Sequence, residues 1–425
     1  MPNKIHNKTT QQRPTNRRDE VADIKVTTPG LSALSEPRTA VSRINQEPNK
    51  DGMNGQWTAH YTGSTSGLLV VDLDDMDTHY EGPMFAYDDN SFFPSVCAYI
   101  TTPDKSTTFQ LSVELLPVNP RTGDLSPWDQ VAPLFPPNSR FPRRAQVNIS
   151  YNSSDTLNLS WTTDINTTGS ADLPKSRASK PTEYKPLADI ANWSQFKSYV
   201  TSLEPRRYIF RGQRELLRLR TGFHRTGRAD LARFLANDIQ TLHRHLSQRT
   251  THIFNLTIPE QNGAFFNLVQ HHGYPTPLLD WTYSPFVGAF FAYRRVKNSE
   301  AARAHDREKV RIFMCDQKLW RSNFQQIAKL APCKPHFSIM EFLAMDNERL
   351  IPQQSISSVT NIDDVETYIR SKETEERRFL QIIDLPLKER PHVMQDLSTM
   401  GITAGSLFPG LDGACEELRE RHFQL

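Results

Sequence analysis

The order of apolar and polar positions divides the chain into parts with different patterns. Residues 1–52 are rich in Asn, Thr, Pro, Arg and Gln and contain few large apolar side chains. Such a segment cannot bury enough apolar surface to offset the entropy lost on folding. The pattern therefore predicts a disordered tail.

In residues 53–169, apolar and polar residues alternate in short stretches, for example at 67–73, 109–115 and 157–161. Turn-forming residues separate these stretches, as at 119–123. Alternation with a period of two at this spacing predicts an antiparallel β barrel or sandwich.

The β domain opens with Gly55 and Trp57 in a G-x-W arrangement, followed by Gly63 and Gly67. This opening resembles the first strand of the meander barrels of lipocalins and avidins. The resemblance implies a sensor for a small ligand or a peptide. A scaffold for protein interaction fits the same residues, because an aromatic side chain can close the end of any barrel.

Residues 170–186 are rich in Pro, Ser and Lys, which predicts a linker. After it, apolar residues recur three or four positions apart in several stretches, with short apolar runs between them. Interleaved helices and strands predict a mixed α/β or α+β domain over residues 187–425. We expect helices near 190–203, 229–247, 263–272, 363–371 and 414–421, a helix opened by Ser284 and Pro285, and strands near 206–213, 278–282, 310–315, 349–351 and 378–383.

Composition narrows the classes of function. A net charge of +2 and a mean hydropathy of −0.58 indicate no strong overall preference for nucleic acid or membranes. The four cysteines are scattered and form no C-x-x-C pair, which favours reduced thiols. The first thirty residues contain no apolar run of signal-peptide length, and no run is long enough to span a bilayer. We therefore expect a cytoplasmic protein without a membrane partner.

Several common catalytic motifs are absent from the sequence. No Walker A or G-x-G-x-x-G motif is present, which argues against P-loop NTPases and Rossmann dehydrogenases. The H-E-x-x-H spacing of zinc enzymes and the G-x-S-x-G elbow of hydrolases are also missing. The side chains of the adjacent His271 and His272 diverge. We therefore expect no metal.

Residues 270–292 place reactive side chains at a strand-to-helix corner. Asp280 and Thr282 end an apolar strand, and Ser284 with Pro285 opens an apolar helix. Folds with helices and strands often place ligand sites at such corners. A buried structural corner explains the same residues, because Ser followed by Pro is a typical helix start.

Four ordered blocks of the C-terminal domain resemble the FRG domain family. The first block contains Phe210, Arg211 and Gly212, which spell the motif that names the family. Two departures are the proline at 277, where the family usually has Arg, and residues 355–357, which replace its usual Gly-x-Phe. The four blocks are residues 208–213, 270–292, 347–354 and 401–413.

The order of these blocks also resembles the mono-ADP-ribosyltransferases that use an Arg/Ser/Glu triad. This resemblance implies NAD as the substrate and an oxocarbenium-like transition state. It implies Arg211 as the cation for the pyrophosphate and Glu348 as the carboxylate that stabilises positive charge. Gln353 or Gln354 would orient the acceptor. Asp280 competes with Glu348 for the carboxylate role. We expect three strands to line one pocket, whose other residues are Phe210, Gly212, Gln213, Gln270, His271, Trp281, Thr282 and Ser284.

Positive charge is concentrated in residues 206–249. This segment contains eleven Arg, three acidic residues and no Lys. Because the planar guanidinium binds phosphate in a fork, the segment predicts an anionic partner, either a dinucleotide pyrophosphate or a nucleic-acid backbone. A solvated helix face with ion pairs between domains would use the same residues.

These observations lead to three hypotheses. In the first, the FRG domain is an ADP-ribosyltransferase-like effector, such as a toxin or defence enzyme, that modifies a protein, nucleic acid or nucleotide. The β domain would restrain or target it. In the second, the FRG domain is a non-catalytic module that binds a phosphate-bearing ligand or nucleic acid, and the β domain recognises a protein or small ligand. In the third, the chain is an interaction protein whose FRG core is only structural.

Overall fold

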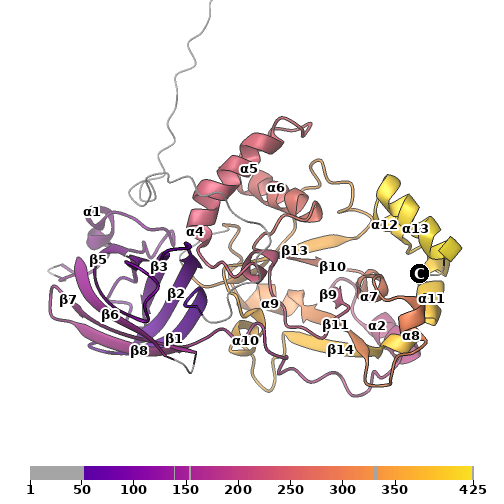
Figure 1. Cartoon of the computed structure of the whole chain (residues 1–425), viewed down its shortest axis with the longest axis horizontal. Helices are drawn as coiled ribbons and strands as arrows, with labels where there is room; N and C mark the ends of the chain where they lie inside the picture. The colour runs from indigo at the N-terminus through magenta and orange to yellow at the C-terminus, as the bar shows by residue number, and fades with distance from the viewer. Residues whose placement is uncertain (1–51, 138, 153–154, 330–333, 424–425) are drawn as a thin grey trace, which may run out of the picture.

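The computed structural model describes residues 52–137, 139–152, 155–329 and 334–423 (Figure 1). An N-terminal barrel lies beside a C-terminal sheet that is covered by helices (Figure 1). The predicted α+β class is thus confirmed. Apart from Gly52, the predicted tail at residues 1–52 lies outside the described residues.

Eight antiparallel strands form a closed barrel in the order of the sequence. The last strand, β8, closes the barrel by pairing its Ser170 with Thr62 of β1. Strand β8 continues to Pro174, so the predicted linker starts too early: residues 170–174 alternate between buried and exposed and belong to the barrel. The strands are β1 (Gly55–Gly63), β2 (Gly67–Asp75), β3 (Tyr80–Asp88), β4 (Val96–Thr101), β5 (Thr108–Pro117), β6 (Arg144–Asn152), β7 (Thr156–Thr163) and β8 (Thr168–Pro174), with short helices α1 (Trp128–Val131) and η1 (Ala132–Leu134) between β5 and β6.

Aromatic and aliphatic side chains fill the barrel interior. Trp57 is fully buried, donates its indole N–H to the carbonyl of Met53 at 2.8 Å, and packs edge-on against Tyr151. A buried indole N–H needs such a partner. Tyr61, Val147 and Leu159 belong to the same core. The G-x-W opening therefore contributes to a packed core.

Six antiparallel strands form the C-terminal sheet in the order β12-β13-β10-β9-β11-β14. The strands predicted near 206–213, 278–282, 310–315 and 378–383 are all present. The bounds are β9 (Tyr208–Gln213), β10 (Leu278–Thr282), β11 (Lys309–Asp316), β12 (Phe337–Met340), β13 (Ser355–Thr360) and β14 (Leu380–Pro386).

The predicted helices are present with shifted ends. The helix predicted over residues 229–247 comprises α4, the π-helical turn η2 and α5 without a break. The helices are α2 (Trp193–Ser202), α3 (Gly222–Arg225), α4 (Leu231–Arg233), η2 (Phe234–Asp238), α5 (Ile239–Leu246), α6 (Pro259–His271), α7 (Pro285–Tyr293), α8 (Asn298–Ala301), α9 (Gln317–Asn323), α10 (Val365–Arg370), η3 (Leu387–Glu389), α11 (Arg390–Thr399), α12 (Ala404–Leu407) and α13 (Leu411–Phe423).

The strand predicted at residues 349–351 is wrong. These residues lie in a turn, and β13 begins only at Ser355. Leu350 is buried while Ile351 is 77% exposed, and the backbone N–H of Ser355 donates to the carbonyl of Leu350 at 2.9 Å. Gln354 has a φ of 47°, in the left-handed region. A turn closed in this way cannot continue an extended strand.

Helices cover both faces of the sheet. On one face, α2, α7 and α11 share an apolar core with Phe210 and Ile312. Gly212 permits this packing, because a Cβ atom there would lie 1.9 Å from the carbonyl oxygen of Gly288 in α7. The opposite face packs against α9 and α10, and α6 covers the β10–β13 end. The first FRG block therefore lies in the centre of the sheet, directly under α7.

Buried polar contacts join the barrel to the C-terminal domain. The carboxylate of Asp74 in β2 accepts hydrogen bonds from the backbone N–H groups of Ala229 and Asp230 and from Arg228. The Gln56 side chain of β1 accepts from the backbone N–H of Asp363 at 2.8 Å. These contacts fix the barrel against the segment between α3 and α4 and against the residues that precede α10.

Among the described residues, no helix combines the length and apolar character that crossing a bilayer requires. Cys97 and Cys315 are buried, Cys415 is exposed, and Cys333 lies outside the described residues.

Candidate functional site

Arg211 lies where β9 and β10 separate. The two strands pair at a single position, Phe210 opposite Thr282, so the edge of β9 is open beyond it. The guanidinium of Arg211 reaches across this opening and donates to the backbone carbonyl of Asp280 at 2.7 Å. It also contacts the side-chain oxygen of Gln213 at 3.5 Å. No carboxylate of the described residues lies within ion-pair distance of Arg211.

The electrostatics around Arg211 indicate a site with surplus positive charge. Burial lowers the pKa of Arg211 to about 10, against the opposing effect of Asp280. The positive charge of Arg225, at the end of α3, lowers the pKa of Arg211 further. Arg225 is exposed, and its side chain makes no hydrogen bond or ion pair with the residues that the structure describes. Loss of water and the charge of Arg220 lower the pKa of Arg225 as well.

A relay of polar side chains connects α3 to β10. Gln270 of α6 donates to the carboxylate of Asp280 at 2.5 Å and accepts a hydrogen bond from Thr276. The backbone N–H of Phe223 in α3 donates to the carbonyl of Thr276 at 3.0 Å. Asp280 stays partly exposed. Arg211, Gln213, Asp280, Gln270 and Arg225 thus form one polar group, which we call the β9–β10 site.

Three other residues expected at the pocket have structural contacts. Trp281 is buried in the core and donates its indole N–H to the hydroxyl of Ser358 at 2.9 Å. The Thr282 hydroxyl donates to the carbonyl of Gln353 at 2.7 Å and accepts from the backbone N–H of Ser284. Ser284 caps α7 by accepting from the backbone N–H of Val287, as the sequence predicts for a helix start.

The turn of residues 347–354 does not line the β9–β10 site as a third strand. Glu348 is exposed, and its carboxylate has no hydrogen bond or ion pair within the described part of the chain. The Gln353 amide is buried and donates to the carbonyl of Leu407 at 2.9 Å. His271 instead contacts the buried Asn347 side chain. The expectation of a pocket with three strand walls is therefore wrong.

Hydrogen bonds join the four FRG blocks in series. Arg211 of the first block binds the second at Asp280, Thr282 of the second binds the third at Gln353, and Gln353 binds the fourth at Leu407. The blocks are therefore neighbours in space, and many of their polar groups serve this contact.

A cavity of about 270 Å³ lies at the other end of β9. The guanidinium of Arg206 stacks over the ring of Tyr283 at 3.9 Å, and the Tyr283 hydroxyl donates to Glu341 at 2.6 Å. Leu350 and Ile351 add an apolar wall. Of the residues expected at the site from the sequence, Gln354 lines this cavity, and it lies away from Arg211 and Asp280.

Ion pairs within the protein occupy much of the Arg-rich segment 206–249. Six of its eleven Arg pair with carboxylates: Arg207, Arg214, Arg218, Arg220, Arg228 and Arg233. Each of the six has at least one acidic partner from a distant part of the sequence, and the sequence could not show these distant pairs. Arg206, Arg211, Arg225, Arg244 and Arg249 have no carboxylate partner in the described structure.

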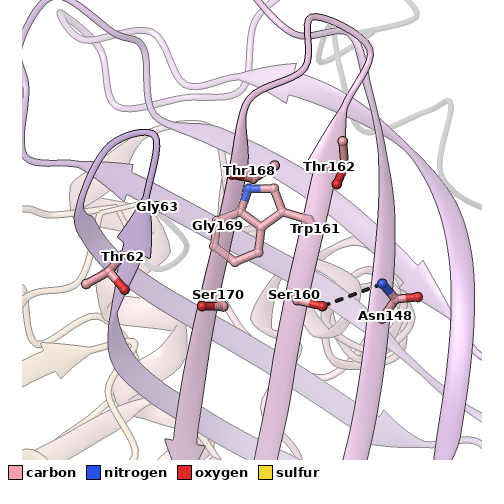
Figure 2. A pocket seen from close by; sticks show the side chains of 9 residues that line it. All are labelled: Thr62, Gly63, Asn148, Ser160, Trp161, Thr162, Thr168, Gly169 and Ser170. Carbon is pink, nitrogen blue, oxygen red and sulfur yellow. Dashed lines mark hydrogen bonds between the residues drawn. The ribbon is translucent and has the colours of Figure 1, made fainter.

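The barrel has a shallow cavity of about 290 Å³ on its wall. Asn148, Ser160, Ser170 and Thr62 are consecutive cross-strand neighbours there, from β6 to β1 (Figure 2). Trp161 lies over Gly169, where a Cβ atom would lie 2.2 Å from the indole ring (Figure 2). The lining is uncharged. This cavity is separate from the packed interior.

Sequence reasoning missed Arg225 as a site residue, although it counted it in the Arg-rich segment. The available signal was its position at the end of a short helix with no acidic residue nearby in the sequence. The described residues contain no group of three His, Cys, Asp or Glu side chains that could hold a metal ion.

Comparisons with known proteins agree with one part of this description. The family model of the FRG domain matches residues 206–301, which span β9, α6, β10 and α7. A search of curated proteins and a search of solved structures returned no match. The matched range contains Arg211, Arg225, Gln270 and Asp280. The chain therefore carries an FRG domain in its C-terminal half.

Proposed function

We propose that the FRG domain binds the phosphate groups of a ligand at Arg211 and Arg225. The observation that carries this proposal is that the Arg211 guanidinium donates to a backbone carbonyl and has no carboxylate partner among the described residues. Arg225, which also lacks a carboxylate partner there, lies at the end of α3, and the backbone of Phe223 bonds this helix to Thr276 beside the site. A phosphate between them would supply the missing negative charge and accept hydrogen bonds from both planar forks. The amide groups of Gln213 and Gln270 add neutral donors at the edge of the site.

The ligand we propose is NAD, whose pyrophosphate fits two guanidinium groups. In an ADP-ribosyltransferase-like reaction, the bond between ribose C1′ and the nicotinamide nitrogen breaks, and its electron pair leaves with nicotinamide. An acceptor nucleophile or water then attacks C1′ and loses its proton. The positive charge that develops on the ribose is stabilised by a nearby carboxylate.

Asp280 is the carboxylate we propose for this role. It is partly exposed, its carboxylate is oriented by Gln270, and its own backbone carbonyl accepts the hydrogen bond from Arg211. Glu348, the residue implied by the transferase resemblance, is exposed in a turn and is not oriented by any neighbour in the described structure. An oriented carboxylate is the better electrostatic stabiliser, because it pays no reorganisation cost during the reaction.

The test combines binding and cleavage of NAD. Isothermal titration of NAD and measurement of released nicotinamide would be performed on the wild type, Arg211→Ala, Arg225→Ala, Asp280→Asn and Glu348→Gln. Loss of a charge-assisted contact should weaken binding by roughly 10-fold to 100-fold in each Arg variant. Asp280→Asn should abolish cleavage and retain binding, and Glu348→Gln should do neither.

Arg244→Ala is the matched control, because Arg244 is an exposed arginine of the same segment without a carboxylate partner. Equal binding by the wild type and both Arg211→Ala and Arg225→Ala would refute the phosphate site. NAD binding without nicotinamide release would leave the domain as a non-catalytic phosphate-binding module. Loss of release in Glu348→Gln alone would restore Glu348 as the carboxylate.

The ion pairs favour a compact anion over a nucleic acid as the ligand. With six of eleven Arg paired inside the protein, few remain to follow a phosphate backbone. A backbone partner would release several counterions and give a steep salt dependence. We expect the affinity for a single-stranded oligonucleotide to be weak at physiological salt.

A further inference from the structure

Arg225 is separated from the barrel contact by only a short turn. It ends α3, and the chain then passes through Gly227, whose φ of 83° is in the left-handed region, to the start of α4. Residues in such a turn have little secondary structure of their own to hold them. A few hydrogen bonds within the segment hold it, and contacts from outside add to them.

The barrel supplies these contacts through one buried carboxylate. One oxygen of Asp74 accepts from the backbone N–H of Ala229 at 2.7 Å and of Asp230 at 3.1 Å, and the other accepts from Arg228 at 2.8 Å. Asp74 is only 2% exposed. Three donors satisfy this buried charge, and all three come from the turn that follows Arg225.

Further barrel residues hold the same turn. Asn54 donates to the carbonyl of Gly227 at 3.2 Å. The Tyr99 hydroxyl donates to the buried carboxylate of Asp230 at 3.0 Å, while Asp230 also caps α4 through the backbone N–H of Arg233. Figure 1 shows α4 next to the barrel strand β2. The turn is thus bound to the barrel at both of its ends.

The barrel also reaches the residues before α3. Gln56 binds the backbone of Asp363, and the carboxylate of Asp363 pairs with Arg220 at 2.5 Å. Arg220 is the cation whose charge lowers the pKa of Arg225. Barrel contacts therefore fix the chain on both sides of the short helix that carries Arg225.

We propose that Asp74 is a positioning residue for Arg225, so that docking of the barrel sets the affinity of the β9–β10 site for phosphate. This inference rests on the proposed phosphate binding. A guanidinium held in place binds an anion without paying to order the side chain and its turn. When the Asp74 contact is lost, Arg225 must be ordered at the moment of binding, and affinity falls. The barrel then acts on the FRG domain without touching the ligand.

The test measures binding of inorganic pyrophosphate to the full chain by titration calorimetry. Asp74→Asn keeps the shape but removes the charge and one acceptor, and it should weaken binding about tenfold. The same change in an Arg225→Ala background should have no further effect, because Asp74 acts through Arg225. Glu114→Gln, at an exposed barrel carboxylate, is the control. A general loss of stability would weaken binding equally in both backgrounds and would overturn the proposal.

Tyr99→Phe provides a second route if Asp74→Asn does not fold. It removes one hydrogen bond to the same turn and leaves the Asp230 carboxylate with the backbone N–H of Arg233 as a donor, and the same cycle with Arg225→Ala applies. Amide hydrogen exchange of residues 225–230 gives a readout without any ligand. Faster exchange in the Asp74 or Tyr99 variant supports the positioning role even if pyrophosphate does not bind, an outcome that would refute the proposed function alone. Unchanged exchange and unchanged affinity refute the positioning role.

Discussion

Gly212 follows Arg211 in β9 and faces the backbone of α7, so Gly212→Ala separates a packing role from a ligand-binding role. The new Cβ atom would lie 1.9 Å from the carbonyl oxygen of Gly288 and 2.5 Å from the backbone nitrogen of Ala292. Both distances are far below van der Waals contact. Because both atoms belong to the backbone of a buried helix, no side-chain rotation can relieve the clash, and strand and helix must move apart.

Overpacking of a core costs about 1–3 kcal/mol. We expect the upper end of this range, about 3 kcal/mol, because α7 lies at the centre of the largest apolar core of the C-terminal domain. With a urea dependence of about 3 kcal/mol per molar, the unfolding midpoint should fall by roughly 1 M.

The assay is urea unfolding followed by tryptophan fluorescence, with Gly222→Ala as the control. A Cβ atom at Gly222 would have its nearest neighbours at 3.4 Å, which is ordinary contact. Gly222→Ala should therefore change the midpoint little. If Gly212→Ala unfolds like the wild type but no longer binds NAD, then Gly212 serves the ligand and the packing argument fails.

Three further predictions concern buried polar groups. Thr282→Val removes the hydroxyl bound to Gln353 and should lower the free energy of unfolding by about 1–3 kcal/mol in urea titrations. Unchanged stability together with lost nicotinamide release would contradict the structural role of Thr282. Burial lowers the pKa of His336 to about 4, so the free energy of unfolding should fall by about 3 kcal/mol as pH drops from 6.5 to 4. In thermal melts, the stability of His336→Gln should fall less steeply with decreasing pH than that of the wild type. An identical pH dependence would refute this prediction. Burial raises the pKa of Asp230 to about 6, so the protonated side chain contributes stability below pH 4, and this contribution is lost as pH rises through 6. Asp230→Asn should remove about 3 kcal/mol from the pH dependence of the free energy of unfolding. An unaltered pH profile would show that Asp230 stays ionised.

The sequence alone determined the local structure. Period-two alternation predicted the barrel, and three-to-four spacing predicted the helices, because both patterns arise from residues close together in the chain. Local signals also predicted the helix start at Ser284. The motif around Arg211 was sufficient to indicate the FRG domain.

The sequence pattern failed where short apolar runs had two explanations. Leu350 and Ile351 looked like a strand, yet one is buried and the other exposed in a turn. Residues 170–174 looked like a linker, because they border a segment rich in Pro and Ser. Their own alternation of apolar and polar residues is too short to indicate a strand. At residues 349–351 a local turn closed by Leu350 and Ser355 decided the outcome, whereas β8 is fixed by pairing with the distant strand β1.

Only the tertiary structure decided which polar residues are available for chemistry. Arg228 finds its carboxylate in Asp74, which is 154 positions away, and the Trp281 and Thr282 side chains are bound by the β13 strand and the 347–354 turn. Arg211 and Arg225 are left without such partners in the described structure. A sequence shows the charges of a chain but not their pairing, because pairing depends on distances that folding sets between remote residues.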